Sequence, residues 1–136
     1  MAFELRDHTA DVAVAATADT FAGVIEEVAA GLTAAQADDV PETGDRFPVT
    51  VTAESREALL FDTMDTLIYE RDVRGVLPTA FDFAVEETED EWVLSGSARG
   101  VPVEDVAGRE IKAVTYSEMS LEETDTGWHA YVVFDV

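Results

Sequence analysis

The chain has 136 residues, of which 47% are hydrophobic and 28% charged, and its mean hydropathy is +0.01. This length fits one domain, and the apolar fraction is too high for an intrinsically disordered chain. No apolar run approaches the roughly 18 to 20 residues of a membrane-spanning helix, and the first residues lack the basic start and apolar stretch of a signal peptide. Cysteine is absent, which excludes disulfides, thiolate zinc sites and a cysteine nucleophile. We therefore expect one cytoplasmic domain that spans residues 1–136.

The charge is strongly unbalanced, because 30 acidic residues face 8 basic ones and give a formal net charge of −22. The acids are spread along the chain, so they do not form a disordered acidic tail. At low salt this charge destabilises a compact state by self-repulsion, whereas at 1 M salt the Debye length falls to roughly 3 Å and most of the repulsion is screened. We therefore expect a halophilic protein. Eight dispersed cations cannot form a basic patch, so we expect no stable direct binding to nucleic acid.

In chain order, the first half of the sequence predicts strands and two helices. Apolar residues first alternate with other residues, which indicates strands, and then recur at helical spacing after the N-cap residues Asp19 and Thr20. Pro48 places the beginning of the next strand at a sheet edge. The predicted elements are strands at 3–5 and 12–16, a helix at 20–32 with Glu26 and Glu27 on its wet side, a strand at 47–53, and a helix that Ser55 opens and that ends at 71–75.

The second half is rich in strands, because the period of the apolar residues changes from 3.6 to 2 at about residue 79. Polar turns at 86–90 and 124–127 indicate hairpins. The predicted strands are 81–85, 92–96, 110–116, 118–123 and 128–135. Two helices among roughly eight strands predict an α+β fold, a single domain with mostly antiparallel β-sheets and two packed α-helices.

The turn Asp7-His8-Thr9-Ala10-Asp11 crowds two carboxylates and an imidazole between two predicted strands. Aspartates in such a turn often hydrogen-bond nearby backbone amides, which is one interpretation. The other is a site for a hard cation, because Ca²⁺ and Mg²⁺ bind carboxylate and carbonyl oxygens. One turn supplies too few ligands, so this second interpretation needs residues from elsewhere in the chain.

The predicted last strand, 128–136, offers such residues. Its alternation puts Trp128 and Phe134 on one face and Asp135 on the other, together with His129. Asp135 beside the chain end supplies a side-chain carboxylate, a backbone carbonyl and the terminal carboxylate in one place. Chain ends often fray, but an apolar strand that continues to the last residue indicates a packed end.

Other candidate residues carry weaker signals. His129 is typical of the exposed side of a strand, and the acidic run 86–91 is typical of a solvated hairpin turn. Arginines beside glycines at 99–100 and 108–109 could contact phosphate, but this pairing is common in loops. No P-loop, nucleophile elbow, zinc motif or dinucleotide fingerprint occurs, and no nucleophile or base accompanies the aspartates. The residues alone therefore predict a non-enzymatic domain with a candidate cation site.

Several blocks of the sequence, in the same order along the chain, resemble the archease family. Each block alone is weakly specific, but their order and the overall length agree with that family. They are the opening motif Asp7-His8-Thr9-Ala10-Asp11, the helix at 20–32, the block Ala58-Leu59-Leu60-Phe61-Asp62, the strand Glu110–Ser117 and the ending Val133-Phe134-Asp135-Val136.

This resemblance implies a protein cofactor rather than an enzyme. Archeases promote guanylylation and multiple turnover of the RtcB-type tRNA-splicing ligase, and they are also described as altering its nucleotide preference. A general chaperone or modulator of proteins that process DNA or RNA is the alternative function that the family suggests. The expected partner is therefore an RtcB-type RNA ligase, and no membrane partner is expected.

The resemblance also implies a divalent cation such as calcium. The ligands that it implies are Asp11, Asp135 and Val136, the last through a main-chain oxygen. Asp7, His8 and Asp38 are candidates for additional ligands or for groups that hydrogen-bond to the ligands. The chief departure from the family is its acidic surface, so partner contacts cannot be inferred from charge.

Overall fold

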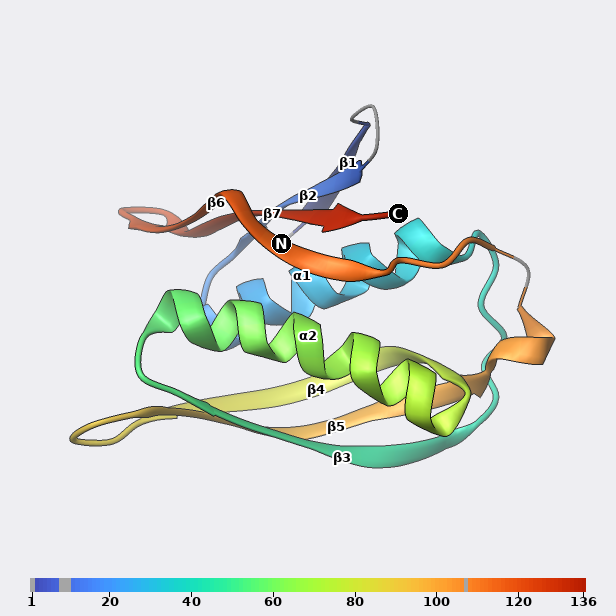
Figure 1. Ribbon diagram of the computed structural model, residues 1–136. Helices are drawn as coiled ribbons and strands as arrows, with labels where there is room; N and C mark the ends of the chain where they lie inside the picture. The colour runs from blue at the N-terminus through green and yellow to red at the C-terminus, as the bar shows by residue number, and fades with distance from the viewer. Residues whose placement is uncertain (1, 8–10, 107) are drawn as a thin grey trace.

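Two helices lie between two antiparallel sheets, which gives the molecule three layers (Figure 1). The computed structural model describes residues 2–7, 11–106 and 108–136. The described residues form seven strands and two α-helices, so the predicted α+β fold with mostly antiparallel sheets is confirmed. Neither helix in this part of the chain is long and apolar enough to cross a membrane.

The four-stranded sheet joins the two ends of the sequence. Its strand order is β1-β2-β7-β6, and all neighbours are antiparallel. The strands are β1 (Ala2–Asp7), β2 (Asp11–Ala18), β7 (Gly127–Asp135) and β6 (Ala113–Thr124). The last strand therefore lies inside the sheet, between β2 and β6.

The three-stranded sheet has β5 in its centre, with β3 and β4 at its edges. The strands are β3 (Asp45–Ala53), β4 (Val76–Glu87) and β5 (Trp92–Pro102). Pro48 lies in edge strand β3, as predicted, because proline cannot donate a backbone hydrogen bond within a sheet. A short 3-10 turn, η1 (Val103–Asp105), follows β5.

Helix α1 (Phe21–Gln36) packs against both sheets. Thr20 is its N-cap, and the Oγ1 atom accepts a hydrogen bond from the Gly23 N–H at 3.0 Å. Glu26, which was expected on the wet side of this helix, is half-buried, and its Oε2 accepts the Phe83 N–H at 2.8 Å. This contact satisfies a backbone donor on edge strand β4.

Helix α2 (Arg56–Arg74) has the caps that the sequence predicts. The Ser55 hydroxyl accepts the Ala58 N–H at 3.0 Å at the beginning of the helix. Gly75 ends it with φ of 66°, a left-handed conformation that glycine adopts without strain.

The predicted strand boundaries needed three corrections. The strands expected at 110–116 and 118–123 are one strand, β6, which is bent by a register shift between Thr115 and Ser120. Glu118 at this bend has φ of 59°. Strand β4 begins at Val76 and β5 extends to Pro102, because these residues pair with each other across the sheet, which the local apolar period does not reveal.

An aromatic cluster ties the three layers together at the beginning of both helices. The Phe21 ring stacks on Trp128 of one sheet, with centroids 5.0 Å apart, and meets Trp92 of the other sheet edge-on at 5.6 Å. The Arg56 guanidinium lies over both indoles, at 5.2 and 5.8 Å from their centroids. The cluster therefore fixes the distance between the two sheets at this end.

Helix α2 also packs against β6 through an aromatic stack. The Phe61 and Tyr116 rings are 3.9 Å apart and nearly parallel, and Tyr116 is still 58% exposed. Desolvation, together with the charge of Asp65, raises the pKa of the Asp62 carboxyl beside this stack. Desolvation and the charge of Asp62 likewise raise the pKa of the Tyr116 hydroxyl.

We predict that Asp62→Asn raises the melting temperature at neutral pH. A carboxyl whose pKa is raised in the folded state opposes folding when it is ionised, and this opposition disappears once it is protonated in both states. The advantage of the variant should therefore vanish as the pH falls below the ordinary value of 3.8. Thermal melts as a function of pH measure this, with Asp90→Asn in the exposed β4–β5 turn as the control. An advantage that persists unchanged in acid would contradict the account.

Candidate functional site

The two aspartates of the predicted cation site face each other across neighbouring strands. Asp11 is the first residue of β2, and in the antiparallel ladder it is directly opposite Asp135, the last residue of β7. A shared site requires the last strand to lie beside the first turn, and the register of β2 and β7 places it there.

Both aspartates lie on the outer face of the four-stranded sheet. Their neighbours Val12 and Phe134 form the next pair in the ladder and are buried in the core, so the alternation of a strand directs residues 11 and 135 to the opposite face. Directly opposed residues have Cβ atoms about 4.5–5.5 Å apart. Asp11 is half-buried with its Oδ1 shielded from solvent, and Asp135 is exposed.

The end of β7 is held on both sides. Asp135 pairs with Asp11 on one side and with Ala113 of β6 on the other. The main-chain N–H of Lys112 also donates to the Asp135 carbonyl oxygen at 2.8 Å. Val136 follows the strand and is 38% exposed. The apolar strand therefore continues inside the sheet as far as Asp135, as the sequence predicts.

Lys112 is the residue near this site that sequence reasoning did not single out. It is the one lysine of the sequence, and its backbone bond to Asp135 fixes it at the site. The signal was its place in the block Glu110–Ser117, but nothing in the local spacing shows that the beginning of this block lies beside the last residues.

The remaining candidate ligands are not brought to this pair by the described residues. The backbone of Asp7 pairs with Val12, whereas its side chain and all of His8 lie outside the described residues. Asp38 is exposed and lines a cavity with Leu5. Leu5 pairs with Val14, whose side chain lies on the inner face of the sheet, so Asp38 lies on the side away from Asp11.

The weaker candidates have ordinary structural roles. His129 is exposed on β7, and the acidic run 86–91 forms the β4–β5 turn, as expected. The Arg109 backbone N–H donates to the Gln36 carbonyl, and its Nε donates to the Ala35 carbonyl. Arg109 therefore supplies hydrogen-bond donors to two carbonyls that have no partner within the last turn of α1.

The donor set at the chain ends fits a hard divalent cation. Like charges directly opposite each other in a sheet are destabilising, and a bound cation would remove this repulsion. Within residues 2–7, 11–106 and 108–136, no three acidic or histidine side chains gather as a metal group. Further ligands would therefore be main-chain, terminal-carboxylate or water oxygens, which Ca²⁺ accepts, and the Val136 carboxylate is the adjacent protein donor.

With two helices between antiparallel sheets and two carboxylates opposed at its chain ends, the protein is an α+β domain with a candidate cation-binding site. A model of the archease protein family (MTH1598/TM1083) matches residues 3–136. The chain therefore belongs to the archease family.

Individual relatives match over nearly the whole chain. The protein archease of Methanosarcina mazei is 32% identical over 98% of this chain and 95% of its own length. That of Pyrococcus furiosus is 29% identical, with 98% of each chain covered. The solution structure of protein 1598 from Methanobacterium thermoautotrophicum has a TM-score of 0.86 and 29% identity, again over 98% of both chains. An archease of Thermotoga maritima, described as a possible chaperone, has the same fold with a TM-score of 0.65 at 23% identity.

We predict that Asp11→Asn and Asp135→Asn each weaken Ca²⁺ binding by about tenfold or more, because even groups that only hydrogen-bond to metal ligands typically contribute 10–100-fold. Asparagine keeps the size of the side chain but loses the charge that a hard cation requires. Deletion of Val136 should have a similar effect, since it moves the terminal carboxylate.

Isothermal titration with CaCl₂ in molar KCl measures these affinities, and circular dichroism checks the fold. Asp90→Asn removes one charge far from the site and should bind like the wild type. The assignment is wrong if Asp135→Asn binds Ca²⁺ as tightly as the wild type does.

Proposed function

We propose that this protein activates an RtcB-type tRNA-splicing ligase, promoting its guanylylation and multiple turnover, with an influence on its nucleotide preference. Membership of the archease family supports this proposal. The observation that carries it is the direct opposition of Asp11 and Asp135 on the outer face of the sheet. A generic binding domain has no need for two carboxylates in this destabilising arrangement.

The proposed site consists of Asp11, Asp135 and Val136 around a divalent cation such as Ca²⁺. A cation held there would supply positive charge for phosphate oxygens in a partner that transfers a guanylyl group. The chain itself contributes rigidity, because the Asp135 backbone is bonded on both sides by β2 and by residues 112–113. The exposed side chain of Asp135 leaves this member of the pair accessible to a partner.

The proposed role is that of a protein cofactor without catalysis of its own. The net charge of −22 disfavours direct contact with RNA. The partner that we propose is therefore the ligase protein, and the tRNA is bound by the ligase.

The test compares single-turnover and multiple-turnover ligation by an RtcB-type ligase, with and without this protein, in molar KCl. We expect stimulation in multiple turnover, together with faster guanylylation of the ligase. Asp11→Asn and Asp135→Asn should lose this stimulation, whereas Asp90→Asn should keep it. Full activation by a folded Asp135→Asn variant that has lost its cation would overturn the metal-site mechanism.

The same experiment separates ligase activation from general chaperone activity, which is the alternative. A chaperone would suppress aggregation of unrelated unfolded proteins and would be indifferent to Asp135→Asn. Suppression of aggregation without any effect on guanylylation would overturn the proposal in favour of that function.

A further inference from the structure

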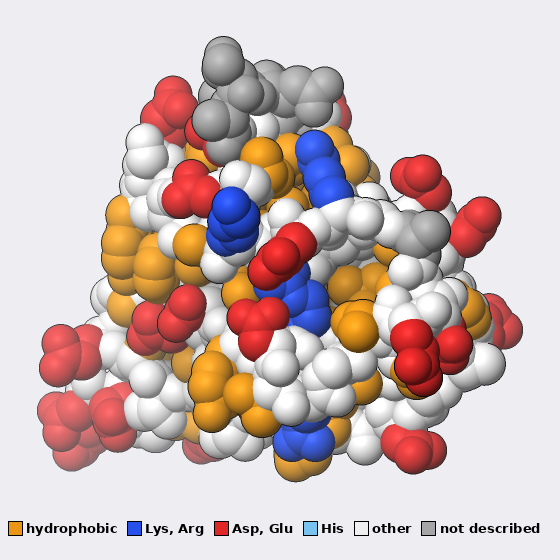
Figure 2. All heavy atoms as spheres, turned by 45° about the vertical axis from the view of Figure 1, so that its right-hand side comes forward, with side chains coloured by type: hydrophobic (Ala, Val, Ile, Leu, Met, Phe, Trp, Pro, Cys, Tyr) orange, Lys and Arg blue, Asp and Glu red, His pale blue; other side chains and the backbone are white. Residues whose placement is uncertain are grey.

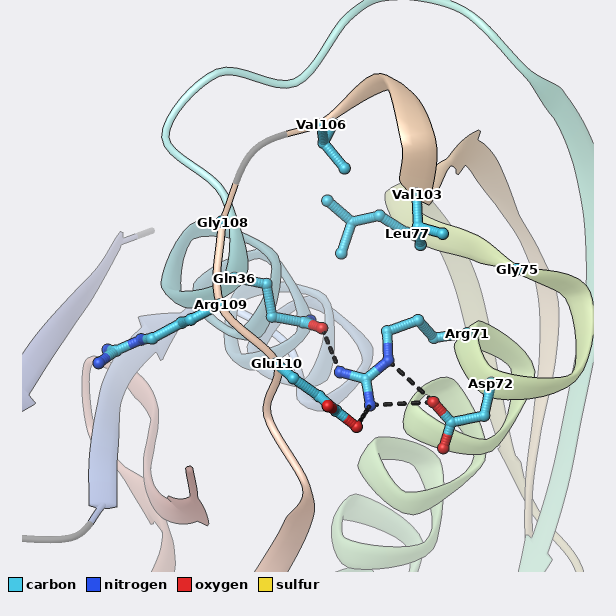
Figure 3. A pocket seen from close by; sticks show the side chains of 10 residues that line it. All are labelled: Gln36, Arg71, Asp72, Gly75, Leu77, Val103, Val106, Gly108, Arg109 and Glu110. Carbon is cyan, nitrogen blue, oxygen red and sulfur yellow. Dashed lines mark hydrogen bonds and ion pairs between the residues drawn. The ribbon is translucent and has the colours of Figure 1, made fainter.

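A cavity of about 390 Å³ lies where the C-terminal ends of both helices approach the segment after β5. Its apolar wall consists of Leu77, Val103 and Val106, and its polar wall is centred on Arg71 (Figure 3). This volume is within the range of about 300–1,000 Å³ typical of small-molecule sites. The cavity shares no residue with the aspartate pair at the chain ends.

Arg71 places a buried positive charge in this cavity. Its side chain is 8% exposed, and its Nη1 donates to the Gln36 Oε1 at 2.6 Å. Gln36 is itself buried, and its Nε2 donates to the Leu32 carbonyl at 3.2 Å. One side of the guanidinium is therefore fixed by a rigid, neutral partner.

The other side of the Arg71 guanidinium faces two exposed carboxylates. Asp72 accepts from Nε and Nη2 at 3.1 and 3.0 Å, whereas the Glu110 Oε1 is 3.6 Å from Nη2, beyond hydrogen-bond distance. The side chains of Asp72 and Glu110 are 59% and 66% exposed. Ion pairs with such exposed partners contribute little to stability, so an anion from solution can replace Glu110 at modest cost.

The surroundings of Arg71 restrict which anion fits. The Arg109 side chain points away from the cavity, so Arg71 is the positive charge that faces it (Figure 3). Acidic side chains surround the basic ones on this side of the molecule (Figure 2), so a multiply charged anion such as phosphate is repelled more strongly than a singly charged one. The apolar wall favours a ligand that also has a hydrophobic part.

We propose that this cavity binds a small amphipathic monocarboxylate. Its carboxylate replaces Glu110 and accepts a charge-assisted hydrogen bond from the Arg71 Nη2. Its short apolar body packs against Leu77, Val103 and Val106. Glu110 and Asp72 are then internal competitors, which cover the guanidinium while the cavity is empty.

The probe is isovalerate, titrated into isotope-labelled protein in KCl and followed by NMR. We expect saturable shifts of the Arg71 Nε–H and of the Gly75 and Gly108 amides. The neutral isovaleramide should bind at least about tenfold more weakly, because charge-assisted bonds to arginine are the stronger ones. The paired variant Asp72→Asn/Glu110→Gln should bind isovalerate several-fold more tightly than the wild type does, because the competing carboxylates are gone.

Two controls make the result specific to the cavity. Asp90→Asn/Glu91→Gln removes the same charge from the distant β4–β5 turn and should leave the affinity unchanged. Val106→Phe fills the apolar part on an irregular segment, and should abolish binding without lowering the melting temperature. The proposal is overturned by an absence of saturable shifts, by equal binding of the amide, by tighter binding of inorganic phosphate, or by equal gains in both paired variants.

Discussion

The pairing of β2 with β7 is the constraint on which the rest of the structure depends. These two strands form the middle of the four-stranded sheet, and their ladder runs without a register shift from Asp11–Asp135 to Ala18–Trp128. One side of the ladder supplies core residues such as Val14 and Val132, which cover α1. The other side carries the aspartate pair. A slip by one residue would exchange these faces, so the core and the candidate site are specified together.

The two ends of this ladder have different roles. At the Trp128 end, Phe21 and Arg56 join both sheets and the beginnings of both helices, which makes this end a packing junction. At the Asp135 end, two like charges meet at the surface, and nothing in core packing requires them there. The Trp128 end is explained by packing, whereas the opposed acidic pair at the Asp135 end is not. For this reason we place the candidate functional site at the Asp135 end.

Much of the fold could be predicted because local periodicity and caps determine it. The caps at Thr20 and Ser55 and the alternation along β7 are local signals, and the structure confirms them. The bend in β6 could not be predicted, because it lies at a register shift in the pairing with β7, which the local sequence does not reveal. The contact between Glu26 and the Phe83 backbone was missed for the same reason, since it joins residues that are far apart in the sequence.

The candidate site was predicted in part. Asp11 and Asp135 were identified by residue chemistry and by resemblance to the archease family, and the register shows that they are opposed. Lys112 was not identified, since only the sheet brings it to Asp135. Asp38 was a candidate for an additional ligand, but it lies on the side away from the pair. Charge patterning alone cannot separate such residues in a chain with 30 acids.

The most direct test of the central claim is to locate the cation. Crystals grown with CaCl₂ and measured for anomalous scattering should show a peak between the carboxylates of Asp11 and Asp135, with the terminal carboxylate of Val136 among its ligands. The same measurement on Asp135→Asn should show no peak at this position. Wild-type crystals with calcium bound elsewhere, and none between the opposed aspartates, would contradict the account.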